Sequence, residues 1–119
     1  MPLSSRYHIS HHIRQTSLLA FQDEIPRLGK RQYEVLKAIR DCNRHRIFPT
    51  DREIARLLGY ADPNRVRPRR HELMEYGLIE EAGKKICPIS GKLAIAWKIS
   101  PRILEKIDLI IRMREEVRE

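Results

Sequence analysis

The chain has 119 residues, which fits one domain with a modest core, and its formal net charge is +8. A basic balance of this size favours a polyanionic partner, most often nucleic acid, whereas aromatic residues at 6% argue against a stacking platform for single-stranded bases. No apolar run approaches the length of about 18 residues that a transmembrane helix needs, and the N-terminus has no apolar signal core. Cys42 and Cys87 form no metal-ligand pattern, so we expect a reducing, cytoplasmic setting.

The first 27 residues are expected to hold a tail and a helix. Residues 1–12 are polar and are interpreted as a loosely ordered tail. The spacing of His8, His11 and His12 could suit a metal, but no carboxylate or cysteine joins them nearby, so neither a metal nor a cofactor is expected. Residues 13–27 are expected to form a helix that Pro26 ends. The apolar side of this helix comprises Ile13, Leu18, Phe21 and Ile25.

Two helical segments follow. Residues 30–42 carry an apolar stripe of Val35, Leu36 and Ile39. Thr50 and Glu53 have the spacing of a capping box, which predicts a short helix over residues 51–58 that Gly59 ends.

A strongly basic helix is expected directly after a turn of about four residues. Asp62 or Asn64 can cap it, Pro63 suits its first turn, and Gly77 suits the residue after its end. Pro68 conflicts with one continuous helix, because proline inside a helix removes a hydrogen bond and clashes with the preceding turn. Either the helix begins near Arg67, or its first turn is separate and kinked. Four arginines fall within six residues of its start, namely Arg65, Arg67, Arg69 and Arg70.

This arginine cluster suits DNA phosphates and base edges. The alternative is an ordinary solvated basic helix. The elements around the cluster favour DNA, because two short helices, a tight turn and a basic second helix form a helix-turn-helix pattern.

A β-hairpin is expected after Gly77, with strands over residues 78–86 and 93–99 and a turn over residues 88–91. The second strand alternates cleanly, whereas Ile79 and Ile86 are seven residues apart and would face opposite sides of a regular strand. A bulge at Gly83 would restore the parity, or else Ile86 lies in a tip twisted away from the core. Lysines gather toward the tip, where they could contact phosphates or only keep the hairpin soluble. These lysines are Lys84, Lys85 and Lys92.

A last helix is predicted over residues 100–119, with Ser100 as its cap and Pro101 as its first residue. Its apolar stripe must be buried against its own domain or against a second copy of the chain. We expect a homodimer that pairs through this helix, together with the helix over residues 13–27. The expected dimerisation residues are Ile103, Ile107, Ile110, Ile111 and Val117.

Phe48 and Pro49, between the two helical segments, are interpreted as a brief extended segment. The order of helix, short strand, helix, turn, basic helix and two-stranded wing is typical of a winged helix-turn-helix domain. Residues 28–99 resemble small winged-helix proteins of bacteria, archaea and their phages. The resemblance lies in residues 50–55 (TDREIA), 62–70 (DPNRVRPRR) and 90–97 (SGKLAIAW). The terminal helices are architecturally similar to those of dimeric regulators of the multiple-antibiotic-resistance type.

The resemblance implies an α+β fold that is mostly helical, with a small hairpin and extra helices at both ends. In such proteins the basic helix usually enters the major groove, and the wing touches the backbone or minor groove. The implied recognition residues are Asn64, Arg65, Arg67, Arg69 and Arg70, and the implied wing residues are Lys84, Lys85 and Lys92.

The expected function is therefore sequence-specific binding of double-stranded DNA, as a dimeric transcriptional regulator. The alternatives are a winged-helix module that binds another protein, and a DNA-handling accessory factor of replication or packaging. An enzyme is not expected, because the sequence has no paired carboxylates beside a histidine, no nucleophile elbow and no phosphate loop.

Overall fold

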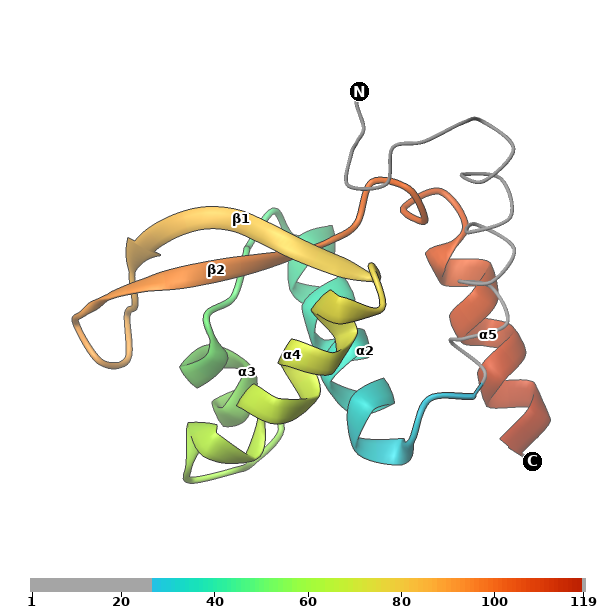
Figure 1. Ribbon diagram of the computed structural model, residues 1–119, viewed down its shortest axis with the longest axis horizontal. Helices are drawn as coiled ribbons and strands as arrows, with labels where there is room; N and C mark the ends of the chain where they lie inside the picture. The colour runs from blue at the N-terminus through green and yellow to red at the C-terminus, as the bar shows by residue number, and fades with distance from the viewer. Residues whose placement is uncertain (1–26, 119) are drawn as a thin grey trace.

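The computed structural model describes residues 27–118, with side chains as far as Glu116. The expected tail over residues 1–12 and nearly all of the expected helix over residues 13–27 lie outside this part. Helices and a two-stranded antiparallel sheet make an α+β fold, so the expected fold class is confirmed (Figure 1). The elements are α2 (Lys30–Arg44), α3 (Asp51–Leu57), the 3₁₀ turn η1 (Pro63–Arg65), α4 (Arg67–Glu75), β1 (Ile79–Ile86), β2 (Leu93–Ile99) and α5 (Ile107–Arg118).

The capping box predicted before α3 is present. Thr50 Oγ1 accepts a hydrogen bond from the Glu53 amide at 3.3 Å, and Glu53 Oε1 accepts one from the Thr50 amide at 3.0 Å. These bonds satisfy two backbone donors that the helix itself leaves unpaired. The start of α3 is therefore fixed by local sequence.

Pro68 divides the basic segment into two pieces. Asp62 Oδ1 caps η1 by accepting a hydrogen bond from the Asn64 amide at 2.9 Å. Helix α4 then begins at Arg67, which makes Pro68 its second residue. In a first turn the missing proline N–H has no partner to lose, so Pro68 is tolerated there. One continuous helix from residue 62 is not formed.

The hairpin contains a bulge at Gly83, which was one of the two alternatives for the first strand. Pairing runs from Ile79 with Ile99 to Ile86 with Leu93, and its register shifts between Glu81 and Gly83. Gly83 has a φ of 109°, which a residue with a side chain rarely adopts. The bulge brings Ile79 and Ile86 to the same side of the sheet, and only Ile79 reaches the core.

One hydrophobic core joins α2, α3, α4 and the base of the hairpin. Trp97 is the largest side chain within it, and Leu36 of α2 is fully buried in the same core. The Trp97 amide donates to the Pro49 carbonyl at 2.9 Å, so the segment before α3 lies against β2. Asn43 closes the end of α2 by accepting a hydrogen bond from the Ile99 amide at 2.8 Å.

The C-terminal segment differs from the expectation in two ways. Helix α5 begins at Ile107, and residues 101–106 form turns that start with a hydrogen bond from the Ile103 amide to the Ser100 carbonyl at 3.1 Å. Bonds between residues three apart produce tight turns instead of an α-helix. The apolar stripe is also buried against its own domain, which was the alternative to the expected contact with a second copy, because four of its members are only 2–4% exposed and belong to the core. These are Ile103, Ile107, Ile110 and Ile111, whereas the side chain of Val117 lies outside the described part.

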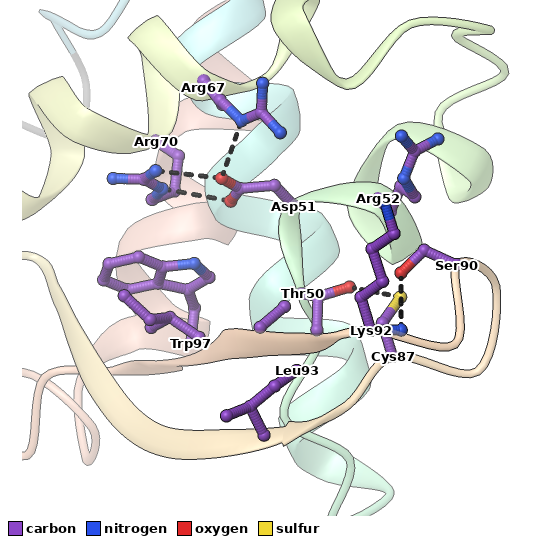
Figure 2. Close-up of a pocket in the computed structure, with 12 residues that line it drawn as sticks. Thr50, Asp51, Arg52, Arg67, Arg70, Cys87, Ser90, Lys92, Leu93 and Trp97 are labelled. Carbon is purple, nitrogen blue, oxygen red and sulfur yellow. Dashed lines mark hydrogen bonds and ion pairs between the residues drawn. The ribbon is translucent and has the colours of Figure 1, made fainter.

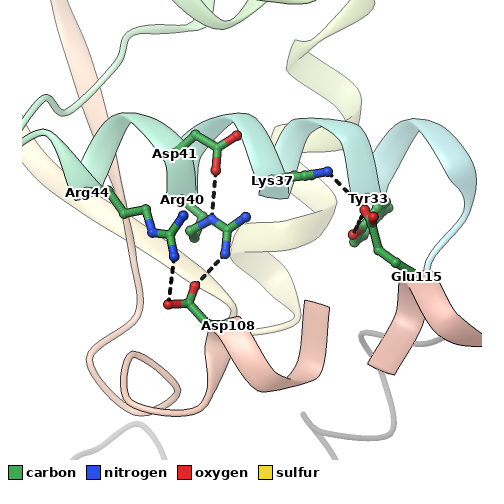
Figure 3. A network of polar contacts seen from close by, with 7 residues as sticks. All are labelled: Tyr33, Lys37, Arg40, Asp41, Arg44, Asp108 and Glu115. Atoms are coloured by element: carbon green, nitrogen blue, oxygen red, sulfur yellow. Dashed lines mark hydrogen bonds and ion pairs between the residues drawn. The ribbon is translucent and has the colours of Figure 1, made fainter. Parts of the chain in front are cut away.

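Polar contacts fasten α5 to α2 (Figure 3). Asp108 accepts hydrogen bonds from Arg40 and, at 3.2 Å, from Arg44. Nearer the C-terminal end of α5, Glu115 accepts from the Tyr33 hydroxyl at 2.5 Å and from Lys37 at 2.9 Å. These acids connect α5 to α2, while the isoleucine stripe packs into the core of the same domain.

Candidate nucleic-acid interface

The outward side of η1 and α4 carries a row of polar side chains. Val66 and Leu73 are fully buried on the inner side of this segment. Helical spacing therefore turns Asn64, Arg67 and His71 toward solvent, where all three are exposed. Arg67 Nη1 donates to Asn64 Oδ1 at 2.5 Å, which orients the two side chains together. His71 was missed by the sequence analysis, although counting turns from Val66 and Leu73 would have placed it in this row.

Arg70 faces inward. Its Nε and Nη2 atoms donate to the two carboxylate oxygens of Asp51 at 3.0 and 2.9 Å. Its guanidinium also lies over the Trp97 ring, 4.3 Å from the ring centroid. Figure 2 shows this bidentate pair beside the indole. Arg70 therefore joins α4 to α3 and β2, and its position argues against a role in reading bases.

Arg69 is also engaged within the domain. Its Nη2 atom donates to Glu72 at 3.0 Å, and the same carboxylate accepts from Gln32 at 2.8 Å. This chain of contacts connects α4 to the start of α2. Two of the arginines that the sequence assigned to recognition are thus held by acids of the domain itself.

Arg65 lies at the other edge of the segment, next to an aromatic ring. Its guanidinium is 4.7 Å from the centroid of Tyr60, and that of Arg31 is 5.2 Å from the same centroid. The Tyr60 hydroxyl donates to Glu34 at 3.0 Å, which fixes the ring. Both arginines are exposed and add positive charge to this edge. Arg31 could not be found from the sequence, because it is 34 positions from Arg65.

A basic groove of about 370 Å³ separates α3 and α4 from the wing (Figure 2). Four cations and one carboxylate line it, and Asp51 is that carboxylate. Within residues 27–118, neither Arg52 nor Lys92 forms an ion pair, so both keep their charge available to a ligand. The basic lining residues are Arg52, Arg67, Arg70 and Lys92.

Arg52 was not among the sequence candidates, because it was interpreted only as part of the capping box. As the second residue of α3 it is exposed and faces the wing across the groove. Arg56, one turn further along α3, is exposed too. Helix α3 therefore supplies cations that the recognition-helix argument overlooked.

Comparison with known proteins adds a family to this geometry. Residues 25–85, a little over half of the chain, match the family of the LexA DNA binding domain. The chain belongs to that family. The resemblance to winged-helix proteins is thereby confirmed.

The wider fold of this LexA-type domain is shared with a solved structure. The crystal structure of transcriptional regulator PA3341 is similar with a TM-score of 0.51 at 22% sequence identity. The similarity covers 89% of this chain and 77% of that chain. At this identity it shows a common fold. A search of the curated proteins finds no match.

The wing of the LexA-type domain presents its lysines unequally. Lys84 and Lys92 are exposed, whereas Lys85 Nζ pairs with Glu53 of α3 at 2.8 Å. Lys85 therefore holds the wing against α3, and the other two remain available for phosphates.

The wing turn is held over the start of α3 by a buried thiol. Cys87 Sγ is 3.2 Å from Thr50 Oγ1, and the Gly91 amide donates to the Cys87 carbonyl at 2.8 Å. Burial raises the pKa of the Cys87 thiol, but hydrogen bonds from Thr50, Ser90 and Ile89 bring that pKa below its usual value. Thr50 and Cys87 both line the basic groove, so this contact forms part of its wall.

Two further searches of the described part concern metals and membranes. Over residues 27–118, no three His, Cys, Asp or Glu side chains are grouped in a way that could hold a metal ion. None of the helices in the same range has the length and apolarity needed to cross a bilayer.

Proposed function

We propose that this chain binds double-stranded DNA in a sequence-specific manner and regulates transcription. The observation that carries the proposal is the outward row of Asn64, Arg67 and His71, which lies beside a groove. The lining of that groove includes two cations without an ion pair among the described residues, Arg52 and Lys92. Membership of the LexA DNA binding domain family supports it. We assign different roles to the row and the groove: the row reads the bases, and the groove binds the DNA backbone.

Base reading is assigned to the outward row. A guanidinium can donate two parallel hydrogen bonds to guanine, and a carboxamide can pair with adenine, in the major groove. Arg67 is 53% exposed and is held by Asn64, so it is ordered yet accessible. His71 lies one turn further along the same side of α4 and extends the row.

Backbone contacts are assigned to the groove and the wing. Arg52, Lys84 and Lys92 are exposed and form no ion pair among the described residues, so phosphates can take their charge without breaking an internal contact. Arg65 and Arg31 extend this positive surface at the far edge of η1. Arg69, Arg70 and Lys85 are assigned to the scaffold, because each is paired with an acid of the domain.

A homodimer stays a prediction, with a different surface. The buried isoleucines cannot provide the interface, since the domain itself covers them. The exposed apolar side chains of the C-terminal segment are Leu104, Leu109 and Met113, and Leu109 and Met113 are one turn apart on α5. We place the dimer contact there. A cytoplasmic location belongs to the same proposal, since Cys42 and Cys87 are both free thiols.

The test begins with selection of bound sequences from a random duplex pool at physiological salt. Arg67→Ala is expected to cost about 1–3 kcal/mol on the selected site and to relax one of its positions. Lys92→Ala should weaken all duplexes alike and lower the salt dependence by about one phosphate contact. Arg112→Ala removes the same charge from exposed α5, on the opposite side of the domain from the wing, and serves as the control (Figure 1).

The outcome of the selection decides between the competing functions. Equal losses on every sequence for Arg67→Ala would contradict base reading and leave a non-specific DNA-handling protein. Absence of binding to any duplex would contradict the proposal as a whole and favour a winged-helix module that binds protein.

A further inference from the structure

Two large aliphatic side chains project from the wing. Ile86 and Leu93 are direct cross-strand partners, and they are 62% and 63% exposed. The hairpin that carries them extends away from the helices (Figure 1). Each side chain leaves most of its apolar surface in water, where burial would be favourable. A paired apolar patch at the end of a projecting element is typical of a contact surface.

The surroundings of this pair indicate what it contacts. Leu93 lines the basic groove together with Arg67 and Lys92, so the apolar pair continues the surface assigned to DNA. Lys84 is two residues before Ile86 on β1, and strand alternation puts the two on the same face. Cations therefore flank the pair on both strands. An acidic surface with apolar recesses matches this arrangement, and a DNA minor groove is such a surface.

We propose that Ile86 and Leu93 form an apolar wedge that enters the minor groove and bends the bound duplex. The inference rests on the DNA-binding function proposed above. Aliphatic side chains cannot pair with phosphates or with base edges. They can insert between base pairs, unstack one step partly and kink the duplex. The lysines beside them would hold the flanking phosphates while the outward row of α4 occupies the major groove.

The wedge also predicts a sequence preference that needs no hydrogen bond. Pyrimidine–purine steps such as TA and CA unstack most easily, so they cost least to kink. Sites selected by the protein should therefore carry such a step at a constant distance from the bases that Arg67 reads. The step itself would be specified by its deformability alone.

The test measures the bend of the selected duplex. The duplex carries a fluorophore at each end, and energy transfer between the two labels reports the bend. The full chain should bend it by about 20–90°, as apolar wedges do. The double variant Ile86→Ala/Leu93→Ala should straighten the duplex and weaken binding by roughly tenfold or more, while the salt dependence stays unchanged because no charge is lost. Leu57→Ala removes a leucine of similar exposure from α3 and should change neither quantity.

Each outcome has a definite meaning. Both replaced side chains are exposed, so the melting temperature should stay within the range of ordinary surface substitutions. A double variant that bends the duplex as fully as the parent overturns the wedge. A parent chain that binds the duplex without bending it overturns the wedge and leaves DNA binding intact. If the free double variant sediments differently and bending is unaffected, the pair is a contact between copies of the chain. Failure of the parent to bind any duplex overturns the proposed function and the wedge with it.

Discussion

Arg70 and Arg67 are three residues apart and carry the same charge, but their replacement by alanine is expected to affect different properties of the protein. Arg70 donates two hydrogen bonds to Asp51 and stacks on Trp97, with only 16% of its side chain exposed. Arg67 is 53% exposed, and its Nε atom is 3.8 Å from the same carboxylate. Arg70→Ala should therefore reduce stability, and Arg67→Ala should reduce DNA affinity.

The magnitude follows from burial and geometry. Removing one partner of a fully buried ion pair costs about 3–5 kcal/mol, because the other charge is left without a partner. The Asp51 side chain keeps 15% exposure, so water relieves part of this cost and we expect about 2–3 kcal/mol for Arg70→Ala. Loss of the contact with Trp97 adds about 1 kcal/mol. Arg67→Ala should cost less than about 0.5 kcal/mol, since exposed pairs contribute little.

Thermal and denaturant unfolding of the full chain measure these values. At about 4 °C per kcal/mol for a domain of this size, a total loss of about 3–4 kcal/mol should make Arg70→Ala melt roughly 12–16 °C below the parent. The melting temperature of Arg70→Lys should lie between those of Arg70→Ala and the parent, because lysine keeps the charge and loses the bidentate geometry. In a double-mutant cycle, Asp51→Ala and Arg70→Ala should show a coupling of about 1–3 kcal/mol. The reasoning is refuted if Arg70→Ala and Arg67→Ala have the same melting temperature. It is also refuted if Arg70→Ala loses its preference among DNA sequences while its stability is unchanged.

Three further predictions concern salt, acid and assembly. With about four phosphate contacts, affinity for a duplex should fall roughly a hundredfold between about 50 and 200 mM salt, and a flat titration would contradict the electrostatic argument. Hydrogen bonds from Arg40 hold the pKa of Asp108 below its usual value, so the stabilisation is fully present above the unfolded carboxyl pKa and is lost as the pH falls through the lower folded value. Asp108→Asn should consequently lower stability at neutral pH and show a weaker acid dependence in denaturant unfolding, whereas parallel pH profiles would argue against the contact. Sedimentation at tens of micromolar should find a dimer that Leu109→Glu and Met113→Glu convert to a monomer, and a monomeric parent would exclude the interface.

Local sequence determined the elements from α2 to the hairpin. The capping box of Thr50 and Glu53, the stop at Gly77 and the bulge at Gly83 were all predicted, because each depends on residues within one turn or one strand pair. The parity of Ile79 and Ile86 left two alternatives, an extra residue in β1 or a twisted tip, and the pairing register shows the extra residue. The winged-helix order followed from these signals, and with it the expectation of DNA binding.

The tertiary structure decided which side chains remain available. Arg70 and Asp51 are 19 positions apart, and no periodicity in either helix reveals that they pair. Arg31 and Arg65 meet at Tyr60 for a similar reason, since the turn that carries the ring must first fold between them. The isoleucine stripe shows the same limit, because the spacing of apolar residues fixes which of them share a face and leaves open what covers that face. Here the domain itself covers it, with Asp108 and Glu115 held by α2.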